Sequence, residues 1–455
     1  MSDARHTDAM TDLQASIAAD MPRTRAELEE LVRIPGCAFP GFPDAEIQRA
    51  CDAVMEILET AGYATVTKLE IEGGKPAVLA ETPGPEGSPT VLLYAHYDVQ
   101  PAGDESLWDS QPFEPTERDG RLYGRGAADD KSGVVIHAAV MRAFEGRPPC
   151  TVRVIVEGEE EWGGPFEEYP RTHPDLFAAD AIVVADVGNA RIGEPTFTTA
   201  LRGMAAVTVH CRTLQGSVHS GMFGGPAPDA LMALIGLLAT LRDADGETAV
   251  DGIEGFEWDG AQFDEADFRE LAGVEPGQPL VGLGSVASRL FSKPVVNVIG
   301  IDAPATQGAI NAVIPEATAR VSLRIPPGQD ALAARDALVE HLRTHAPWGI
   351  SVSVTPEAVG QGVRVATDGP AYAAAREAMS QAYGTPAKEI GAGGSIPLID
   401  SLRAAVPAAE ILLFGAQDPM ARIHAPNESV DLAELERAVV AQALFLRNYG
   451  VSKPR

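Results

Sequence analysis

Four short apolar runs, separated by segments of helical periodicity, constrain the fold of this chain more than any other feature. They extend from Thr90 to Ala95, Thr151 to Val156, Ala181 to Ala185 and Glu410 to Phe414. Runs this short and almost wholly apolar are typical of strands buried on both faces of a sheet. Their alternation with helices predicts an α/β domain with a central sheet.

Helices are expected before the first strand, from Thr11 to Val32 and from Asp44 to Ala61. After about residue 200 the pattern changes to that of a smaller α+β insert. Its expected elements are strands at Ala205 to Cys211 and Thr318 to Ile325 and helices around Asp229 to Arg242 and Ala331 to Thr344. The acidic stretch Gly252 to Glu270 is expected to form an exposed loop.

The length of 455 residues exceeds what one hydrophobic core usually serves. We therefore expect two domains. One is an α/β domain built from residues 1–199 and 365–455, and the other is inserted over residues 200–364.

The formal net charge of -30 argues against several classes of partner. Nucleic acids and anionic membranes repel a strongly acidic surface, so neither is expected. No apolar run approaches the roughly 20 residues that span a bilayer, and the polar start lacks the order of a secretory signal. The four cysteines form no Cys-x-x-Cys pair, which argues against a thiolate zinc site. A cytoplasmic location is expected.

A histidine and an aspartate follow the first apolar run. His96 and Asp98 are two residues apart, so in an extended chain both side chains project to one side. The histidine can bind a metal ion through one ring nitrogen while the carboxylate holds the proton on the other. Taken alone, the motif fits a surface histidine beside a loop aspartate better.

Two acidic pairs have competing interpretations. Asp129 and Asp130 stand between glycines, ahead of an apolar helix expected from Val134 to Phe144, and an aspartate there can simply cap the helix. Glu160 and Glu161 follow the second apolar run, where they form either a solvated acidic turn or part of a cation site.

These side chains together indicate a metal site, because they are expected at the same edge of the sheet. Asp186 follows the third run and His424 follows the fourth, and open α/β sheets bind ligands at the carboxyl ends of their strands. Two histidines and three or more carboxylates suit a pair of ions such as zinc, with one carboxylate bridging them. Two ions roughly 3.5 to 4 Å apart can polarise a carbonyl and lower the pKa of a shared water.

The ordered set of motifs resembles the metallopeptidase family of carnosinase-type dipeptidases, carboxypeptidase G, aminoacylase and succinyl-diaminopimelate desuccinylase. The residues that carry the resemblance are His96, Asp98, the segment Gly126 to Lys131, Glu160, Glu161, Asp186 and His424. It implies a zinc-exopeptidase-like catalytic domain with a mixed central sheet, and an inserted α+β domain that acts as a lid or in dimerisation.

The resemblance also implies roles for these residues. Two zinc ions per subunit are expected, with Mn²⁺ or Co²⁺ as substitutes. His96 and Glu161 would bind opposite metals, Asp186 and His424 would complete the two shells, and Asp129 would bridge. Asp98 would orient His96, and Glu160 would be the general base that passes a proton from water to the leaving amine. The peptide bond between Asp129 and Asp130 is typically cis in this family.

Substrate-binding elements match as well. His219 resembles the insert-domain histidine that faces the developing oxyanion, either within its own subunit or across a homodimer; the alternative is a turn histidine among glycines. Arg324 resembles the arginine that binds a substrate carboxylate, and its alternative is a surface ion pair. Gly394 and Ser395 precede an expected helix, so their backbone N–H groups form an anion seat. The dipeptidases usually carry Arg-Glu where Gly391-Ala392 stand here.

Three interpretations remain: a dipeptidase, a deacylase of N-acetyl or N-succinyl amino acids, and a non-catalytic relative. A non-catalytic relative would normally lack a ligand or the base, and both are present here. Asp at position 186 favours the dipeptidases, because the other branches usually place Glu there. We expect a hydrolase of small peptides with a free carboxylate.

Overall fold

The structure is a computed structural model that describes residues 2–394 and 396–451. The chain divides into two compact units. Unit 1 comprises Met1–Thr199, Val365–Ile390 and Leu398–Arg455, and unit 2 comprises Ala200–Arg364 and Gly391–Pro397. The short segment Gly391–Pro397 was expected in the first domain. It joins unit 2 because its backbone packs against that unit: a Cβ added at Gly391 would be 2.5 Å from the Cβ of Phe291.

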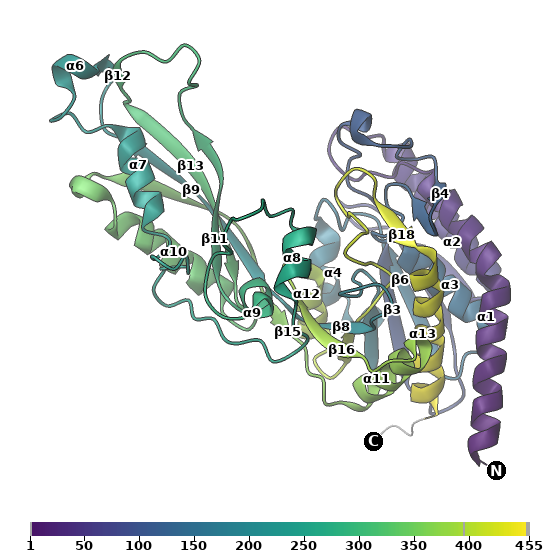
Figure 1. Cartoon of the computed structure of the whole chain (residues 1–455). Helices are drawn as coiled ribbons and strands as arrows, with labels where there is room; N and C mark the ends of the chain where they lie inside the picture. The colour runs from purple at the N-terminus through teal and green to yellow at the C-terminus, as the bar shows by residue number, and fades with distance from the viewer. Residues whose placement is uncertain (1, 395, 452–455) are drawn as a thin grey trace. The chain divides into compact units, whose positions relative to one another are not determined.

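Unit 1 is built on a six-stranded sheet in the order β1-β2-β6-β3-β7-β17, of which Figure 1 labels the neighbouring strands β6 and β3. The strands β6, β3, β7 and β17 are parallel, whereas β1 and β2 add an antiparallel edge, so the sheet is mixed as expected. The strands are β1 (Thr65–Leu69), β2 (Ala77–Thr82), β3 (Thr90–His96), β6 (Thr151–Glu157), β7 (Ala181–Val184) and β17 (Glu410–Leu413). The four parallel strands match the four apolar runs to within one residue at either end.

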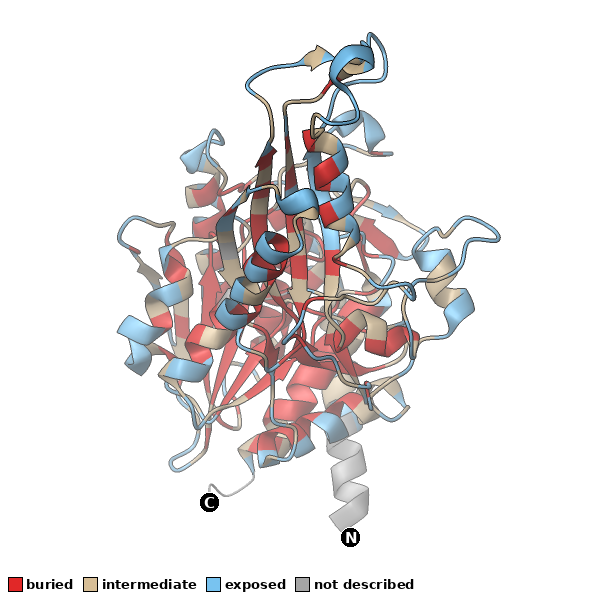
Figure 2. Ribbon diagram, turned by 90° about the vertical axis from the view of Figure 1, so that its left-hand side faces the viewer, coloured by how far each residue is buried: buried red, intermediate tan, exposed pale blue. Residues whose placement is uncertain are grey.

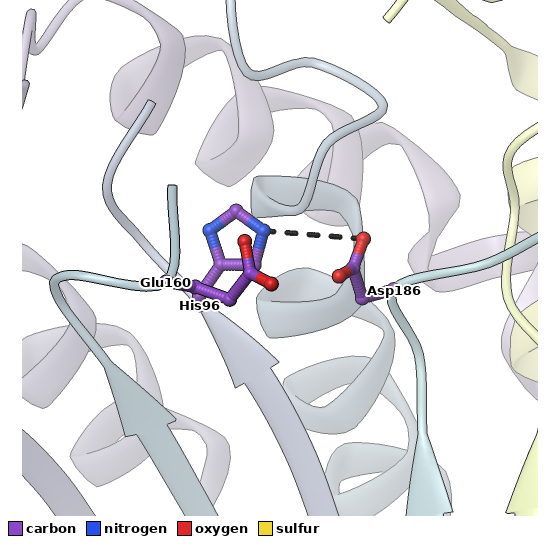
Figure 3. Close-up of side chains that lie close together, drawn as sticks. All are labelled: His96, Glu160 and Asp186. Carbon is purple, nitrogen blue, oxygen red and sulfur yellow. Dashed lines mark ion pairs between the residues drawn. The ribbon is translucent and has the colours of Figure 1, made fainter. Parts of the chain in front are cut away.

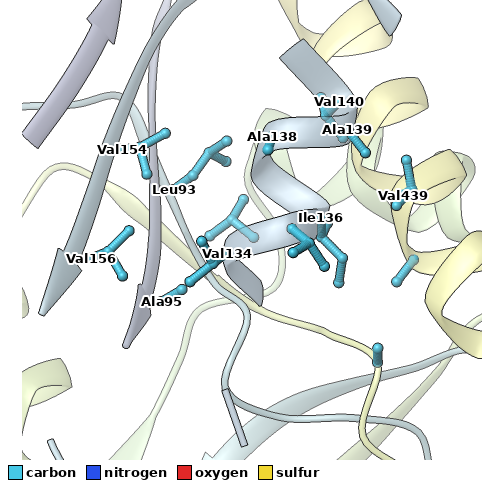
Figure 4. Close-up of a cluster of buried hydrophobic side chains, with 14 of the residues drawn as sticks. Leu93, Ala95, Val134, Ile136, Ala138, Ala139, Val140, Val154, Val156 and Val439 are labelled. Atoms are coloured by element: carbon cyan, nitrogen blue, oxygen red, sulfur yellow. The ribbon is translucent and has the colours of Figure 1, made fainter. Parts of the chain in front are cut away.

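The core of unit 1 lies between this sheet and its helices. Figure 4 shows Leu93 and Val154 of the sheet facing Val134 and Ala138 of α3, whose far side meets Val439 of α13. Every residue of α3 from Lys131 to Met141 is buried, because the helix is covered on both sides. The helices of this unit are α1 (Ser2–Val32), α2 (Asp44–Ala61), α3 (Lys131–Ala143), α4 (Tyr169–Thr172), α5 (Pro174–Phe177), α11 (Pro370–Tyr383), α12 (Pro397–Ala405) and α13 (Leu432–Gly450).

In the part of the chain that the structure describes, two small sheets and three 3-10 turns complete the fold. A three-stranded sheet runs in the order β18-β5-β4, and another runs in the order β15-β8-β16. Their strands are β4 (Thr116–Arg118), β5 (Arg121–Tyr123), β8 (Thr196–Leu201), β15 (Val363–Arg364), β16 (Lys388–Ala392) and β18 (Ser429–Asp431). Single 3-10 turns lie at Glu105–Leu107, Pro165–Glu168 and Pro347–Gly349. None of the helices in the described residues is long and apolar enough to cross a membrane.

Unit 2 is built on a four-stranded antiparallel sheet in the order β11-β13-β9-β14. Its core joins Val207 and Leu323 of the sheet to Leu234 of α7 and Leu338 of α10. In Figure 2 the buried residues, coloured red, are prominent along the strands. The elements are β9 (Gly203–Arg212), β10 (Val218–His219), α6 (Ser220–Phe223), α7 (Ala230–Ala239), α8 (Glu265–Leu271), α9 (Val286–Phe291), β11 (Val295–Asp302), β12 (Ala312–Val313), β13 (Glu316–Ile325), α10 (Ala331–Thr344) and β14 (Val352–Gly360).

One expectation for unit 2 was wrong in part. The stretch Gly252 to Glu270, expected as a loop, contains the first six residues of α8. Asp264 caps this helix by accepting a hydrogen bond from the backbone N–H of Ala266, and Glu265 pairs with Arg269 one turn on. Capping and an i,i+4 ion pair therefore form a helix where acidic composition alone indicated a loop.

Candidate metal centre

The parallel strands of unit 1 deliver the candidate residues to one edge of the sheet. His96 is the last residue of β3, Asp186 closely follows β7, and Glu160 and Glu161 follow β6. The chain passes from β3 to its neighbour β6 and then back across β3 to β7, so the strand order reverses at β3. Ligand sites form at such switch points because adjacent connections leave in opposite directions.

The first group of side chains surrounds His96. Its Nε2 lies 3.2 Å from Oδ1 of Asp129 and 3.9 Å from Oδ1 of Asp186. Figure 3 shows His96 and Glu160 beside each other, with Asp186 facing the imidazole. One ligand atom from each of His96, Glu160 and Asp186 falls within 4.8 Å of the others, a spacing that can hold a metal ion.

The second group surrounds the other oxygen of Asp129. Nε2 of His424 lies 3.0 Å from Oδ2 of Asp129 and 3.1 Å from Oε2 of Glu161. His96, Asp129 and Glu161 also lie within 4.8 Å of one another. The two oxygens of Asp129 thus face different imidazoles, which is the geometry of a carboxylate between two cations.

The negative charges of the cluster favour the binding of a cation. Burial first, and then the charge of Asp129, raise the pKa of the Asp186 carboxyl well above its ordinary value. Burial also raises the pKa of Glu160 to about 8, and Glu161 adds to this rise. Buried carboxylates this close repel one another unless positive charge lies among them. Imidazole nitrogens and carboxylate oxygens are ligands that suit divalent ions such as Zn²⁺, Mn²⁺ or Co²⁺.

Asp129 and Asp130 have different positions, and the helix-cap interpretation describes only Asp130. Asp130 caps α3, accepting a hydrogen bond from the N–H of Gly133 at 3.2 Å. Asp129 faces the two histidines. The peptide bond between the two residues is cis, as the family resemblance implies.

Asp98 contacts His96 and also fixes the acidic turn. Nδ1 of His96 lies 3.1 Å from the backbone oxygen of Asp98 and 3.4 Å from its carboxylate Oδ1. The same carboxylate accepts hydrogen bonds from the backbone N–H groups of Glu160 and Glu161, both at 3.1 Å. Asp98 therefore positions three candidate residues. The sequence predicted that it orients His96 but did not predict its contacts with Glu160 and Glu161.

Two glutamines that the sequence analysis did not single out hold candidate ligands. The amide of Gln100 donates to Oε2 of Glu161, and that of Gln417 donates to Oδ1 of Asp186, each at 3.0 Å. Such outer contacts fix the orientation of a ligating carboxylate. A glutamine four residues after His96 gives no signal of this role in the sequence.

Glu428 organises the loop that carries Asp129. Its side chain is fully buried, and its carboxylate accepts hydrogen bonds from the backbone N–H groups of Gly126, Ala128 and Asp129 at 2.9 to 3.1 Å. The guanidinium of Arg125 donates to the same carboxylate at 2.6 Å. The sequence offered one signal, the short distance from His424 to this acidic residue.

His424 reaches the cluster from an exposed loop. Its side chain is 52% exposed, and its backbone has a φ of 60°, in the left-handed region that non-glycine residues rarely adopt. Arg422 and Asn427 of the same loop share this conformation. Positive φ angles concentrated next to a polar cluster are typical of functional loops.

The substrate-binding residues expected in the insert belong to unit 2. His219 is exposed, and its Nδ1 accepts the N–H of Gly221 at 3.1 Å, so the turn interpretation describes its contacts. Arg324 lies on β13 opposite Val295 and Met204 and has no ion pair among the described residues, against the surface-pair alternative. A Cβ added at Gly394 would meet nothing within 4 Å, so this backbone is open. Ser395 lies outside the described residues.

Comparisons with known proteins agree with the resemblance seen in the motifs. The sequence profile of peptidase family M20/M25/M40 matches residues 92–448. A cysteinylglycine-S-conjugate dipeptidase of Corynebacterium striatum is 36% identical over 451 residues, which cover 97% of this chain and 99% of that protein.

Two solved structures share the fold. The dipeptidase Dug1p of Saccharomyces cerevisiae superposes with a TM-score of 0.81 at 21% identity, covering 98% of this chain and 99% of that one. Human carnosine dipeptidase 1 also gives a TM-score of 0.81, at 24% identity, covering 97% of this chain and 98% of that one. The inserted α+β unit is thus part of a shared architecture. With its profile match and its relative of nearly equal length, the chain belongs to peptidase family M20/M25/M40.

Proposed function

We propose that this metallopeptidase hydrolyses the amide bond of dipeptides, or of comparably small peptides with a free carboxylate, with two divalent cations held on either side of Asp129. The observation that carries the proposal is the position of Asp129 between His96 and His424, one carboxylate oxygen toward each imidazole. His96 and Asp186 would hold one cation, and Glu161 and His424 the other.

Zinc is the cation we propose, with Mn²⁺ or Co²⁺ able to replace it. The support is the donor set, imidazole nitrogen and carboxylate oxygen without any thiolate. Two such ions act as Lewis acids that polarise a carbonyl and make water a stronger nucleophile at neutral pH.

Glu160 is the proposed general base. Asp98 holds the backbone of Glu160 and Glu161 with separate carboxylate oxygens, so the two neighbours keep distinct orientations. Glu160 lies beside His96, where it can take a proton from water and return it to the leaving amine. Its distances also permit it to bind a cation with His96 and Asp186, and the two roles predict different metal contents for a variant.

A dipeptide is the proposed substrate for two reasons. The relative with 36% identity is named as a dipeptidase, and this chain matches it almost from end to end. The second reason is the aspartate at position 186, because the other branches of the family usually place glutamate there. Arg324 and the Gly394–Ser395 backbone are proposed to bind the free carboxylate, and His219 to face the developing oxyanion.

The proposal is tested by hydrolysis of unblocked dipeptides against their N-acetylated and N-succinylated counterparts, using metal-loaded protein. We expect cleavage of the free dipeptides, and a loss of about 10²- to 10⁴-fold in Glu160→Gln with metal content unchanged. Preference for the acylated compounds would make the protein a deacylase, the second candidate function. Equal rates in Glu160→Gln would contradict the assignment of the base.

We also propose that the protein is a homodimer. The edge strand β11 exposes six consecutive residues from Asn297 to Asp302, including Val298, Ile299 and Ile301. An edge strand with apolar side chains exposed along it is a template for pairing with another chain. Sedimentation should give a dimer for the wild type and a monomer for Ile299→Lys. Ile192→Lys, an equally exposed isoleucine of unit 1, should leave the dimer intact, and a monomeric wild type would contradict the proposal.

The cytoplasm is the proposed location. All four cysteines are free and buried, which suits a reducing compartment. Fractionation of the source cells, with antibody detection of the chain, tests this.

A further inference from the structure

A cavity of about 280 Å³ lies within unit 2 and combines positive charge with apolar walls. Three arginines line it, Arg202, Arg242 and Arg289. Its walls include Phe268 of α8, Leu290 of α9 and Val295 of β11.

Arg202 is the most constrained of these arginines. The residue is 9% exposed, and its Nε and Nη1 atoms are buried without a hydrogen-bond partner among the residues that the structure describes. Burial first, and then the charge of Arg324, lower the pKa of this guanidinium to about 10. Buried guanidinium nitrogens without an acceptor are unfavourable, so a ligand that accepts hydrogen bonds from Nε and Nη1 would be stabilised here.

The neighbouring arginines also lack acidic partners. Arg242 donates to the backbone oxygens of Gly246 and Val296, each at 2.7 Å, and Arg289 likewise donates to backbone oxygens. Within residues 2–394 and 396–451, none of Arg202, Arg242, Arg289 and Arg324 forms an ion pair with a carboxylate. The chain has 65 acidic residues against 35 basic ones. A shortage of acidic residues in the chain therefore does not explain why these arginines lack acidic partners.

The backbone at Ala392 and Gly393 lies against Arg202. The N–H of Arg202 donates to the oxygen of Ala392 at 3.3 Å. A Cβ added at Gly393 would be 3.1 Å from Nη2 of Arg202, so a side chain there would crowd the guanidinium. Glycine at this position leaves room for the charged group beside the cavity.

We infer that this cavity binds a small organic carboxylate with an apolar remainder, and that Arg202 pairs with the carboxylate. A guanidinium matches a carboxylate in charge and in its paired donor geometry. The volume is at the small end of the range for ligand pockets, which limits the apolar remainder to a few carbon atoms. The carboxylate is either that of a bound substrate, in which case the inference rests on the proposed function, or that of a separate effector.

Calorimetry on the metal-free protein tests the inference with 4-methylpentanoate as the probe. Metal is removed because a carboxylate also binds to metal ions. We expect the acid to bind at least about tenfold more tightly than its neutral analogue 4-methylpentanamide, since only the acid pairs with a guanidinium. Equal affinities, or no binding of the acid, would overturn the inference. Neither result depends on peptidase activity, so failure here is distinct from failure of the proposed function.

Variants locate the binding. Arg202→Met should weaken binding of the acid by about tenfold or more, and Arg202→Lys should restore part of it. Arg269→Gln is the matched control, because Arg269 lies on nearby α8, pairs with Glu265 and does not line the cavity. Unchanged affinity in a folded Arg202→Met protein would contradict the inference, and the comparison of acid with amide stands if that variant does not fold.

The two sources of the carboxylate are separated by kinetics of the metal-loaded enzyme. If the site takes the carboxylate of the substrate, 4-methylpentanoate inhibits competitively and Arg202→Met raises KM with little change in kcat. If it takes an effector, the inhibition or activation is not competitive. In both cases the effect is lost in Arg202→Met, and competitive inhibition that persists in this variant would count against the cavity.

Discussion

The two units collect opposite charges for opposite kinds of ligand. Unit 1 brings Asp129, Glu161 and Asp186 together around two imidazoles, and the resulting excess of negative charge fits cations. Unit 2 brings arginines around a cavity where no described residue gives them an acidic partner, and that excess of positive charge fits an anion. The net charge of -30 predicts neither the cation centre nor the anion cavity. The class of ligand follows from the local cluster of side chains and not from the charge of the whole chain.

The clusters also differ in how firmly they are held. In unit 1 the candidate ligands other than the exposed His424 lie at the ends of buried parallel strands or in loops fixed by Asp98 and Glu428. In unit 2, His219 lies on a two-residue strand and is exposed. Firm placement suits the chemistry step, which tolerates little misplacement, whereas substrate contacts tolerate more.

The largest effect is expected from Asp129→Asn. The variant removes the charge shared by both candidate cations, so kcat/KM should fall by about 10³-fold or more. Steady-state kinetics with a dipeptide, together with metal analysis of the same sample, measure both losses. Full activity with two bound ions would show that Asp129 does not bridge the cations. The contrast between a cation centre in unit 1 and an anion cavity in unit 2 would then lose its main support.

Glu428→Gln should have the next largest effect. The variant keeps the size of the side chain but removes the charge that Arg125 and three backbone N–H groups share, so metal affinity should fall by about 10- to 100-fold. Competition with a chelator of known affinity measures this.

The matched control for Glu428 is Glu434→Gln. Glu434 is also a fully buried carboxylate of unit 1, but it accepts from Asn189 and Gly193 and not from the loop that carries Asp129. It should lose stability without losing metal affinity. Equal losses of affinity in both variants would mean that any damage to unit 1 disturbs the centre.

A substitution in unit 2 should affect substrate binding rather than chemistry. Arg324→Met removes a proposed partner of the substrate carboxylate, so KM should rise by about tenfold or more while kcat stays within a few-fold. Initial rates over a range of dipeptide concentrations separate the two constants. A fall in kcat at unchanged KM would place Arg324 among the groups that act in the transition state.

The smallest expected effect concerns His137 in the core of unit 1. Burial lowers the pKa of His137 to about 4, so its neutral form contributes stability that is present above pH 6.5 and is lost as the pH falls toward 4. At pH 5 the loss is about 2 kcal/mol in the free energy of unfolding. Urea unfolding at pH 7 and 5 should show this loss in the wild type and a smaller one in His137→Asn. Identical pH dependence in both proteins would contradict it.

The fold and the centre of unit 1 were largely predictable because their signals are local. Each strand is a compact apolar run, and His96, Glu161, Asp186 and His424 lie at a strand's end or in the next loop, whereas Asp129 directly precedes α3. Parallel pairing brings ligands from distant parts of the chain together without further information in the sequence. The family resemblance supplied the roles, which stay predictions, and the structure places Asp129 between His96 and His424.

The features that sequence reasoning missed depend on contacts between distant segments. Glu428 is a single acidic residue in a polar loop until the fold buries it against backbone about 300 residues earlier. Arg202 is one arginine at the end of a strand until α8, α9 and β11 enclose it, and α8 itself lies where acidic composition indicated a loop. Burial without a partner becomes visible only in three dimensions.

Metal content of the purified protein tests the central claim most directly. Elemental analysis after gel filtration in zinc-containing buffer should find two ions per chain in the wild type. His424→Ala and Asp186→Ala should each keep one, because each removes a ligand from a different side of Asp129. A single ion in the wild type, or loss of the same ion in both variants, would contradict the two-cation centre.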